Sequence, residues 1–373
     1  MSKIRILFII PTYSDKGAGV TEAARGLAMQ LAKNTDLSVM AIALNDAGTQ
    51  AAMSNWTEIK TYRLGNSGLG FSTMLSRTIS EINPNIIHIH GLWLGIGVQA
   101  AFWAIRNNVQ YFVSPHGMMD RWAWNKSKLR KLIYFYLFQR RVLLNSTILH
   151  SLNKEESDSV KDILPNKESI IIPNGICVED YKSASNNISN TKKLLFLGRL
   201  DPKKSVLELV IAWSELLDDG EADGWSLEVA GSGNARYEKL LRKAAGKHLN
   251  KGINFKGHVL GAEKIECFRS ATAFVLASKS EGLPVVILEA WASSLPVAIS
   301  KECNLSNSLD LGLSFEVYSE KKKLKKSLGE FIKLDSCELE AMGKNSLRYV
   351  SQNYSWGSIA GEFTRLYKKH RYK

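Results

Sequence analysis

Short apolar runs alternate with longer amphipathic stretches along most of this 373-residue chain. Apolar runs of about four to eight residues are typical of buried strands, and apolar residues three or four positions apart are typical of helices. In the first half we expect strands at 4–10, 37–44, 86–89, 111–114 and 147–150 and helices at 20–33, 73–82 and 96–107. This alternation predicts an α/β fold with parallel sheets covered by helices on both faces.

The second half repeats the alternation after a stretch rich in Ser and Asn. Its expected strands are 194–197, 226–230, 253–255, 273–277 and 297–299, with a helix at 285–292 and a last helix at 359–369. A chain of 373 residues is too long for one ordinary core. We therefore predict an N-terminal domain over 1–175, a linker over 176–191, a C-terminal domain over 192–355 and a terminal helix within 356–373.

Composition favours a globular enzyme of the cytoplasm. Hydrophobic residues make up 45% of the chain, which is typical of globular proteins. The four cysteines show no C-x-x-C spacing, so neither a zinc site nor a disulfide framework is expected. The apolar opening segment 3–11 is short and ends at a proline, which favours a first strand over a signal peptide. No apolar run approaches the length of a membrane span.

Two glutamates stand eight positions apart around a turn. Glu281 precedes the turn Gly282-Leu283-Pro284, and Glu289 lies in the apolar helix expected at 285–292. Proline suits a first helical turn because its missing N–H would have no partner there. We expect Glu281 in the strand-to-helix turn, where free backbone N–H groups favour anions. Glu289 then lies one to two turns into the helix, within reach of the sugar end of a bound nucleotide.

This segment resembles the paired-glutamate motif of retaining nucleotide-sugar glycosyltransferases of family four, the glycosyl transferases of group 1. The resemblance implies the GT-B fold, with two Rossmann-like domains facing across a cleft and a C-terminal helix that crosses back to the N-terminal domain. It also implies that Glu281 contacts the donor sugar, that Glu289 binds the ribose, and that Gly282 and Leu283 offer backbone amides to sugar and phosphate. Ser294 replaces a frequent glycine of the family, which we interpret as a packing variation.

A basic turn follows the strand expected at 194–197. A diphosphate needs positive charge, and it needs more as it becomes a leaving group. Arginine can bind two phosphate oxygens at once, and lysine supplies a compact charge. Gly198-Arg199-Leu200 followed by Lys204 matches the family's phosphate-binding pattern, except that Ser205 replaces its final glycine. The resemblance implies that Arg199 and Lys204 stabilise the leaving diphosphate in place of a divalent metal, so no metal or other cofactor is expected.

Glycine turns at three other strand ends match the family in part. Gly19 aligns with the second of two family glycines near phosphate and acceptor, and Ala18 replaces the first. Gly231 follows an expected strand and is the first glycine of a Gly-x-Gly sequence. This sequence lacks the third glycine of a dinucleotide-binding fingerprint. By resemblance it passes beside the nucleotide, and Gly257 ends the base-binding strand. Recognition by main-chain atoms leaves little side-chain code, so UDP-sugar and GDP-sugar donors both remain open.

Histidine followed by glycine ends two strands of the first half. These are His90-Gly91 and His116-Gly117, and both are expected at the carboxyl edge of the sheet, where ligands bind. No carboxylate or cysteine completes a recognisable ligand set beside them, so a metal site is not expected. The resemblance implies that His116 orients the donor sugar. His90 resembles a frequent family feature without a defined role, and His88 is expected to be structural.

Positive charge is concentrated in one segment. The net charge is +13, and residues 121–141 contain several Lys and Arg, aromatic residues and no acid. This composition suits a helix lying on anionic lipid. The alternative is a helix whose apolar stripe packs into the N-terminal domain while its lysines are solvated. Nucleic acid is a less favoured partner because aromatic and glycine-rich RNA-binding motifs are missing.

These features predict a retaining, metal-independent hexosyltransferase. It would move a sugar from a UDP- or GDP-sugar to a hydroxyl of a lipid-linked saccharide acceptor, at the inner face of a bacterial membrane, in lipopolysaccharide, O-antigen or capsule biosynthesis. Two alternatives stay open. A nucleotide-sugar epimerase on the same fold is disfavoured by the spacing of the glutamates, and a non-catalytic nucleotide-sugar-binding subunit is disfavoured by the intact basic and acidic pairs.

Overall fold

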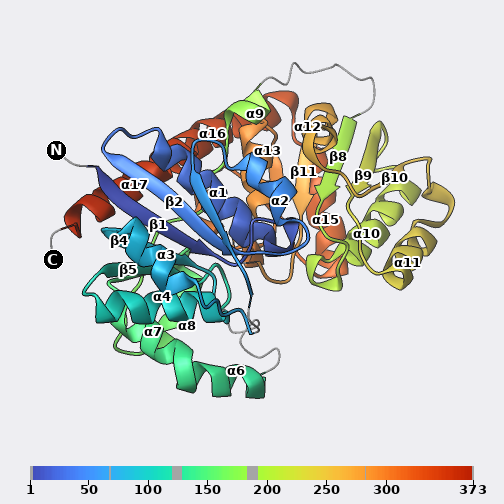
Figure 1. Cartoon of the computed structure of the whole chain (residues 1–373). Coiled ribbons are helices and arrows are strands. Elements are labelled where there is room, and N and C mark those ends of the chain that lie inside the picture. Colours follow the sequence, from blue (N-terminus) through green and yellow to red (C-terminus); the bar gives the residue numbers. More distant parts are fainter. Residues whose placement is uncertain (1–2, 67–68, 120–127, 183–191, 282, 372–373) are drawn as a thin grey trace. The chain divides into compact units, whose positions relative to one another are not determined.

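The computed structural model describes residues 3–66, 69–119, 128–182, 192–281 and 283–371, and it divides the chain into two compact units. Unit 1 consists of Met1–Gly175 and Trp356–Lys373, and unit 2 consists of Ile176–Ser355. Each unit has a parallel sheet accompanied by helices (Figure 1). The predicted α/β fold class is confirmed.

Within the described residues, the sheet of unit 1 has seven strands in the order β3-β2-β1-β4-β5-β6-β7. The strands are β1 (Ile4–Ile10), β2 (Leu37–Leu44), β3 (Lys60–Leu64), β4 (Ile86–His90), β5 (Gln110–Ser114), β6 (Ile148–Ser151) and β7 (Ile170–Ile171). The helices are α1 (Ala18–Ala32), α2 (Thr49–Ala52), α3 (Leu75–Ile82), α4 (Gly95–Arg106), α6 (Lys128–Tyr134), α7 (Arg140–Asn145), α8 (Lys154–Ile163) and α17 (Trp356–Lys369).

Side-chain alternation along the strands divides the interior of unit 1 into two cores. Ile6 and Phe8 of β1 pack with α1 and α17 on one face of the sheet. Leu7 and Ile9 of the same strand pack with α3, α4 and α7 on the other face. Since successive side chains of a strand point to opposite faces, one apolar run supplies both cores. Helix α17 contacts α1 and thereby belongs to unit 1, although it follows unit 2 in the sequence.

The sheet of unit 2, within the part of the chain that is described, has six strands in the order β10-β9-β8-β11-β12-β13. The strands are β8 (Lys192–Leu197), β9 (Trp225–Ala230), β10 (Ile253–Gly257), β11 (Ala273–Leu276), β12 (Val297–Ile299) and β13 (Phe315–Glu316). The helices are α9 (Glu179–Lys182), α10 (Val206–Asp218), α11 (Ala235–Ala245), α12 (Gly261–Ser270), α13 (Val285–Ala292), α14 (Ser306–Asp310), α15 (Lys321–Ile332) and α16 (Ser336–Asn353).

Both sheets therefore have the strand order of a Rossmann fold, in which the order reverses between the first and fourth strands. Ligands of such sheets bind outside the carboxyl ends of the strands at this switch point. The switch point lies between β1 and β4 in unit 1 and between β8 and β11 in unit 2. Residues that follow these four strands are the first candidates for a site.

The stretch expected as a linker is in part a component of unit 2. Ile176, Val178 and Tyr181 are buried in its hydrophobic core, and Ile176 donates its N–H to the carbonyl of Tyr354 at 2.7 Å. Residues 183–191 lie outside the described residues. The Ser- and Asn-rich composition thus marks only the later part of 176–191 as a candidate linker.

Both serines that replace family glycines adopt the left-handed conformation that glycine adopts most readily. Ser205 has φ = 51° and Ser294 has φ = 58°. An L-residue in this region is strained because its Cβ approaches a neighbouring carbonyl. Ser294 is therefore a substitution at a position with a backbone requirement, and the interpretation as a packing variation missed that reason.

We predict that Ser294→Gly stabilises the protein. Relief of the left-handed strain, at about 1–2 kcal/mol, exceeds the entropic cost of a glycine, about 0.5–1 kcal/mol. The net gain of about 0.5–1 kcal/mol should appear as a higher midpoint of thermal unfolding. The neighbouring Ser293→Gly is the matched control, because Ser293 has φ = −84° and its hydroxyl donates to the Glu289 carbonyl. A lower midpoint for Ser294→Gly would contradict the strain argument.

Candidate active site

Three strand ends of unit 2 meet so closely that one of them requires glycine. Gly231 follows β9, and a Cβ at this position would lie 1.8 Å from the carbonyl oxygen of Gly198, which follows β8. The Gly231 N–H also donates to the Gly257 carbonyl at the end of β10, at 2.6 Å. Any side chain at 231 would push the turns after β8 and β9 apart. Two of the predicted glycine positions in unit 2, Gly231 and Gly257, therefore lie side by side at the carboxyl edge.

An ion pair occupies the switch point of unit 2. Lys204 Nζ lies 2.7 Å from Glu281 Oε1, and the side chains are only 17% and 14% exposed. The Ser278 hydroxyl donates to the same oxygen at 2.6 Å. Lys204 follows β8 and Glu281 follows β11, which are neighbouring strands. The structure thus brings together the residue predicted to bind the diphosphate and the residue predicted to bind the sugar.

The backbone on both sides of this pair is fixed by hydrogen bonds. Asp201 accepts from the Lys203 N–H at 2.9 Å and caps the short 3₁₀ turn that carries Lys204. Glu281 donates its N–H to the Glu302 carbonyl at 2.9 Å, and its own carbonyl accepts from the Asn304 amide at 2.6 Å. Gly282 lies outside the described residues, and Leu283 is partly buried against the unit 2 core. The sequence predicts backbone donors around the Glu281 carboxylate, whereas its described partners are side chains.

Arg199 is not part of this ion pair. Its side chain is 71% exposed, and its guanidinium Nε lies 3.9 Å from Asp201. At that distance and exposure the pair contributes little to stability. Arg199 is therefore a solvated cation on the turn after β8, adjacent in sequence to Gly198. Its side chain is exposed, whereas that of Lys204 is largely buried.

Glu289 is buried in α13 and holds two partners on one carboxylate oxygen. Its Oε1 accepts from Lys264 Nζ at 2.5 Å and from the Tyr181 hydroxyl at 3.0 Å. Its Oε2 is buried without a hydrogen-bond partner among the described residues. An unpaired buried carboxylate oxygen is unfavourable, and a hydroxyl donor from a ligand would satisfy it. Burial, together with the neighbouring Glu289, raises the pKa of the Tyr181 hydroxyl, so Tyr181 remains a donor.

The residues that sequence reasoning missed are Tyr181, Lys264 and Ser278. Tyr181 lies 108 residues before Glu289, and Lys264 lies 25 residues before it. No local pattern links them, because the contacts arise when α9 and α12 pack beside α13. Ser278 was within reach of sequence reasoning, since it lies three residues before Glu281 in the same turn.

In unit 1, His116 and His90 form a contact at the ends of β5 and β4. His116 Nε2 lies 3.0 Å from His90 Nδ1, and the rings are stacked with centroids 5.3 Å apart. His116 Nδ1 and His90 Nε2 are buried without hydrogen-bond partners among the described residues. Burial lowers the pKa of His116 to about 3, and it lowers the pKa of His90 as well. Both imidazoles are therefore neutral at physiological pH.

Gly19 lies in the first turn of α1, with open space where a Cβ would stand. The helix follows β1, so this glycine also lies beside the switch point of unit 1. Nothing in its described surroundings requires glycine for packing. The interpretation that a ligand approaches the backbone closely at Gly19 therefore stays a prediction from the sequence motif.

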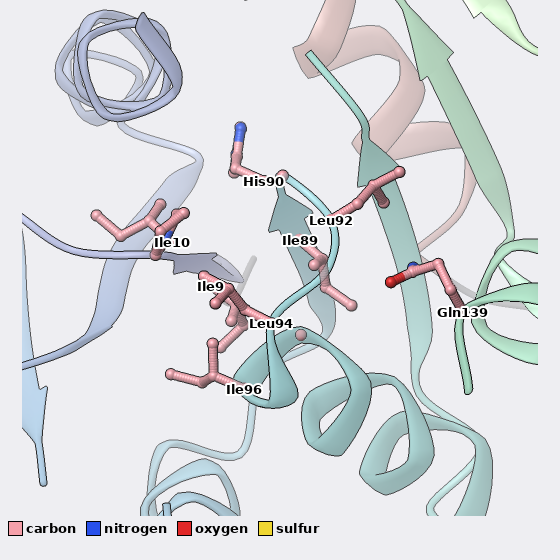
Figure 2. Close-up of a pocket in the computed structure, with 11 residues that line it drawn as sticks. Ile9, Ile10, Ile89, His90, Leu92, Leu94, Ile96 and Gln139 are labelled. Atoms are coloured by element: carbon pink, nitrogen blue, oxygen red, sulfur yellow. The ribbon is translucent and has the colours of Figure 1, made fainter. Parts of the chain in front are cut away.

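A cavity beside His90 is too small and too apolar for a sugar. It is lined mainly by aliphatic residues of β1, β4 and the start of α4, and Gln139 borders it from one side (Figure 2). Its volume of about 10 Å³ corresponds to roughly one water molecule. The cavity is a packing defect next to the switch point, and we assign it no binding role.

His88 belongs to a hydrogen-bonded chain whose direction is fixed by one carbonyl. His150 Nε2 lies 2.6 Å from the Ile172 carbonyl oxygen, which can only accept, so His150 Nδ1 must accept. The Ser114 hydroxyl donates to that nitrogen at 2.6 Å and accepts from His88 Nε2 at 2.7 Å. The Tyr367 hydroxyl of α17 then donates to His88 Nδ1 at 2.7 Å. His88 is structural, as expected, and it ties α17 to the sheet.

Neither a metal centre nor a membrane span is apparent in the described part of the chain. No three His, Cys, Asp or Glu side chains there are grouped as a metal-binding set. No described helix is both long enough and apolar enough to cross a membrane.

Comparisons with known proteins identify two family models. The model described as "Glycosyl transferases group 1" matches residues 178–348, and the model described as "Glycosyltransferase Family 4" matches residues 18–180. Together they cover most of the chain. The first match contains every candidate residue of unit 2, and the second contains His90, His116 and Gly19.

Individual relatives agree with these models. An uncharacterized glycosyltransferase of Methanocaldococcus jannaschii is 29% identical over 180 residues, which is 48% of this chain and 45% of that protein. The UDP-Gal:alpha-D-GlcNAc-diphosphoundecaprenol alpha-1,3-galactosyltransferase of Escherichia coli is 27% identical over 63% of this chain and 64% of that protein. The matches thus span less than two thirds of either relative. The solved structure of Anabaena HepE with UDP has a TM-score of 0.79 and 15% identity, covering 98% of this chain and all of that one, which shows the shared fold.

The buried histidines predict that acid destabilises unit 1. Burial lowers the pKa of His150 to about 4, against about 6.5 in an unfolded chain. Between these pH values the unfolded state binds more protons than the folded state. The free energy of unfolding is therefore highest above about pH 6.5 and decreases as the pH falls. At pH 5 the loss should be about 2 kcal/mol for His150, seen as a lower unfolding midpoint than at pH 7. His150→Gln should weaken this pH dependence, and an identical dependence in that variant would exclude His150 as the cause.

Proposed function

The chain belongs to the glycosyltransferases of group 1 with the GT-B fold, and we propose that it transfers a sugar from a nucleoside diphosphate with retention of anomeric configuration. The observation that carries the proposal is the arrangement in unit 2. One buried carboxylate, Glu289, has an unpaired oxygen for a hydroxyl, and one ion pair, Lys204–Glu281, lies at the switch point of the sheet. A nucleotide-sugar presents a ribose, a diphosphate and a sugar, and these groups match those residues in kind.

The proposed roles follow from charge and burial. Lys204 would stabilise the leaving diphosphate, because a half-buried cation acts more strongly on developing charge than a solvated one. Arg199, which is exposed, would add a second phosphate contact. Glu281 and His116 would orient the donor sugar, and Glu289 would bind the ribose through Oε2. The departing phosphate would accept the proton of the acceptor hydroxyl on the same face of the sugar, so no separate base is needed.

The donor is proposed to be a UDP-sugar, with a GDP-sugar as the other candidate. The E. coli relative uses UDP-Gal according to its name, and the HepE structure contains UDP. A thermal-shift screen with UDP, GDP and ADP tests this point. A ligand at 100 times its dissociation constant stabilises the protein by about 2.7 kcal/mol. We expect the unfolding midpoint to rise with UDP or GDP, and no shift with any of the three would overturn the proposed nucleotide site.

The acceptor is proposed to be a lipid-linked saccharide in bacterial surface-polysaccharide assembly. The name of the E. coli relative gives a diphosphoundecaprenol-linked acceptor, and another relative is named as a teichuronic acid biosynthesis enzyme of Bacillus subtilis. An acceptor of this kind lies in a membrane, so the enzyme would work at the inner membrane surface. Transfer of labelled sugar to a lipid-linked acceptor from sugars linked to the nucleotide that the screen identifies, with the anomer assigned by NMR, tests the reaction.

The basic segment would provide the surface for this location. The part 121–127 lies outside the described residues, and the rest continues through α6, a π-helical segment (Phe135–Gln139) and α7. Phe135 and Val142 are buried in unit 1, which agrees with a packed helix. Ile133, Tyr136 and Leu137, however, are 55%, 67% and 65% exposed on the other side. An exposed apolar stripe beside cationic residues favours an anionic lipid surface.

Lys204 and Glu289 should differ in their kinetic effects. Lys204→Ala should lower kcat more than donor affinity, by about 3–4 kcal/mol in the barrier, because leaving-group charge grows in the transition state. Glu289→Ala should weaken UDP or GDP binding, because a ribose contact is equal in ground and transition states. Lys279→Ala is the matched control, since Lys279 lies in the same turn as Glu281 but its ammonium pairs with Glu208 instead. Unchanged nucleotide affinity in Glu289→Ala would remove the ribose assignment.

Turnover should not require a divalent metal. Lys204 and Arg199 supply positive charge beside the proposed diphosphate, and the sequence contains no Asp-x-Asp motif to hold a metal on it. Activity in excess EDTA should equal activity in buffer alone. Loss of activity that magnesium or manganese restores would contradict the leaving-group role of both cations.

Membrane binding should depend on the exposed apolar stripe. Replacing Ile133, Tyr136 and Leu137 with Ser should weaken binding to phosphatidylglycerol vesicles by roughly 1 kcal/mol per side chain, measured by sedimentation. Leu240 and Leu260 are exposed leucines of unit 2, and their replacement with Ser is the control. Raising the salt concentration should also release the unmodified protein, since each Lys or Arg near the surface contributes about 1 kcal/mol. Equal binding to neutral and anionic vesicles would contradict an electrostatic contribution.

A further inference from the structure

The turn after β5 holds two consecutive residues in the left-handed region. His116 has φ = 55° and Gly117 has φ = 75°. Glycine adopts this conformation without strain, whereas histidine is strained in it. Such a backbone persists only when surrounding groups hold it. The turn also carries the His116 imidazole, which is proposed to orient the donor sugar. The group that holds this turn in place therefore affects the proposed reaction.

A buried carboxylate in the first turn of α8 holds this turn. Glu156 Oε1 accepts from the Gly117 N–H at 2.6 Å, and Glu156 Oε2 accepts from the Leu152 N–H at 2.8 Å. Glu156 is 1% exposed. Both oxygens of the side chain therefore accept from backbone N–H groups at short distances. One side chain therefore joins the loop after β5 to the loop after β6.

At its position in α8, a glutamate usually forms a capping box with the residue that caps the helix, but Glu156 does not. Asn153 caps α8 by accepting from the Glu156 N–H at 2.8 Å, so Glu156 is the third residue of the helix. A glutamate at that position usually returns to the backbone N–H of the capping residue, as Glu338 does to Asp335 in α16 at 2.9 Å. Glu156 instead accepts from the N–H of Leu152, the residue before the cap, with one oxygen, and from the N–H of Gly117 with the other.

The ring of His116 is held separately by His90. With His116 Nε2 engaged by His90 Nδ1 at 3.0 Å, Nδ1 is the ring nitrogen that has no hydrogen-bond partner among the described residues. The backbone restraint from Glu156 and the ring contact with His90 together fix where this nitrogen points. A shift of about 1 Å in such a group can lower a rate by about 100-fold.

We propose that Glu156 is a positioning residue for transfer, which acts by locking the His116–Gly117 turn so that the free Nδ1 of His116 meets the donor sugar. This inference rests on the proposed function, in which His116 contacts the donor sugar. Glu156 itself would not contact the substrate. Its effect must pass through His116, and this requirement separates it from an ordinary helix cap.

The first test needs no substrate. Glu156→Gln keeps the size of the side chain but replaces one of its two acceptor oxygens with an NH₂ donor, so the Gly117 amide signal should move and the His116 ring ¹⁵N shifts should change in NMR spectra. The matched control is Glu338→Gln, which makes the same substitution at the same helix position in α16. It should leave both signals unchanged. Unaltered His116 ring shifts in Glu156→Gln would overturn the proposal.

The second test is a double-mutant cycle on sugar transfer from UDP-glucose or GDP-mannose, whichever carries the nucleotide that the thermal-shift screen identifies. Glu156→Gln should lower kcat about 10- to 100-fold, with UDP or GDP affinity unchanged. In a His116→Ala background the same substitution should have no further effect, because the group it positions is absent. Equal effects in both backgrounds would make Glu156 merely structural and leave the proposed function intact. Full activity of His116→Ala would remove the sugar role of His116 and this inference with it.

Discussion

The half-buried ion pair between Lys204 and Glu281 is the constraint on which the geometry of the unit 2 site depends. Either charge alone at this position would be strongly unfavourable, because a charge withdrawn from water needs a partner. The pair forms because β8 and β11 are neighbours at the reversal of strand order, so the turns after them meet. Ser205 then takes a strained left-handed conformation directly after Lys204. The backbone of this turn is thus adapted to the position of the charge.

Glu289 obeys the same rule with one difference. Its Oε1 is satisfied twice, by Lys264 and Tyr181, whereas its Oε2 is left without a partner inside the described protein. A carboxylate held so firmly on one oxygen presents the other in a fixed direction. Such preorganisation reduces the cost of ordering a site when a ligand binds. Tyr181 belongs to the first helix of unit 2, so the proposed ribose contact depends on how the chain enters that unit.

Sequence patterns predicted the buried strands well and the edge strands poorly. The helix at 285–292 and the strands at 4–10 and 37–44 have the predicted bounds, because long apolar runs determine them. Strand β3 was missed because its sequence, Lys-Thr-Tyr-Arg-Leu, is largely polar at the sheet edge, and β7 and β13 have only two residues each. The candidate site residues come from motifs in the sequence. Their partners do not, since Lys264, Tyr181 and Glu156 reach the site through packing between separate elements.

The chain leaves unit 1 at Gly175 and returns to it at Trp356, so unit 2 is an insertion of 180 residues into unit 1. Unit 1 is incomplete without its last helix, because Phe363 and Tyr367 fill the core beside α1 and Tyr367 begins the hydrogen-bonded chain to His88. Joining the two ends of a flexible loop of that length costs conformational entropy. Unit 2 removes most of this cost when folded, since its own ends are paired: Ile176 and Ser355 form a parallel bridge. When unit 2 is folded, the start of α17 therefore lies next to Gly175, where the chain leaves unit 1. Packing of α17 onto unit 1 then requires no further closure of a long loop.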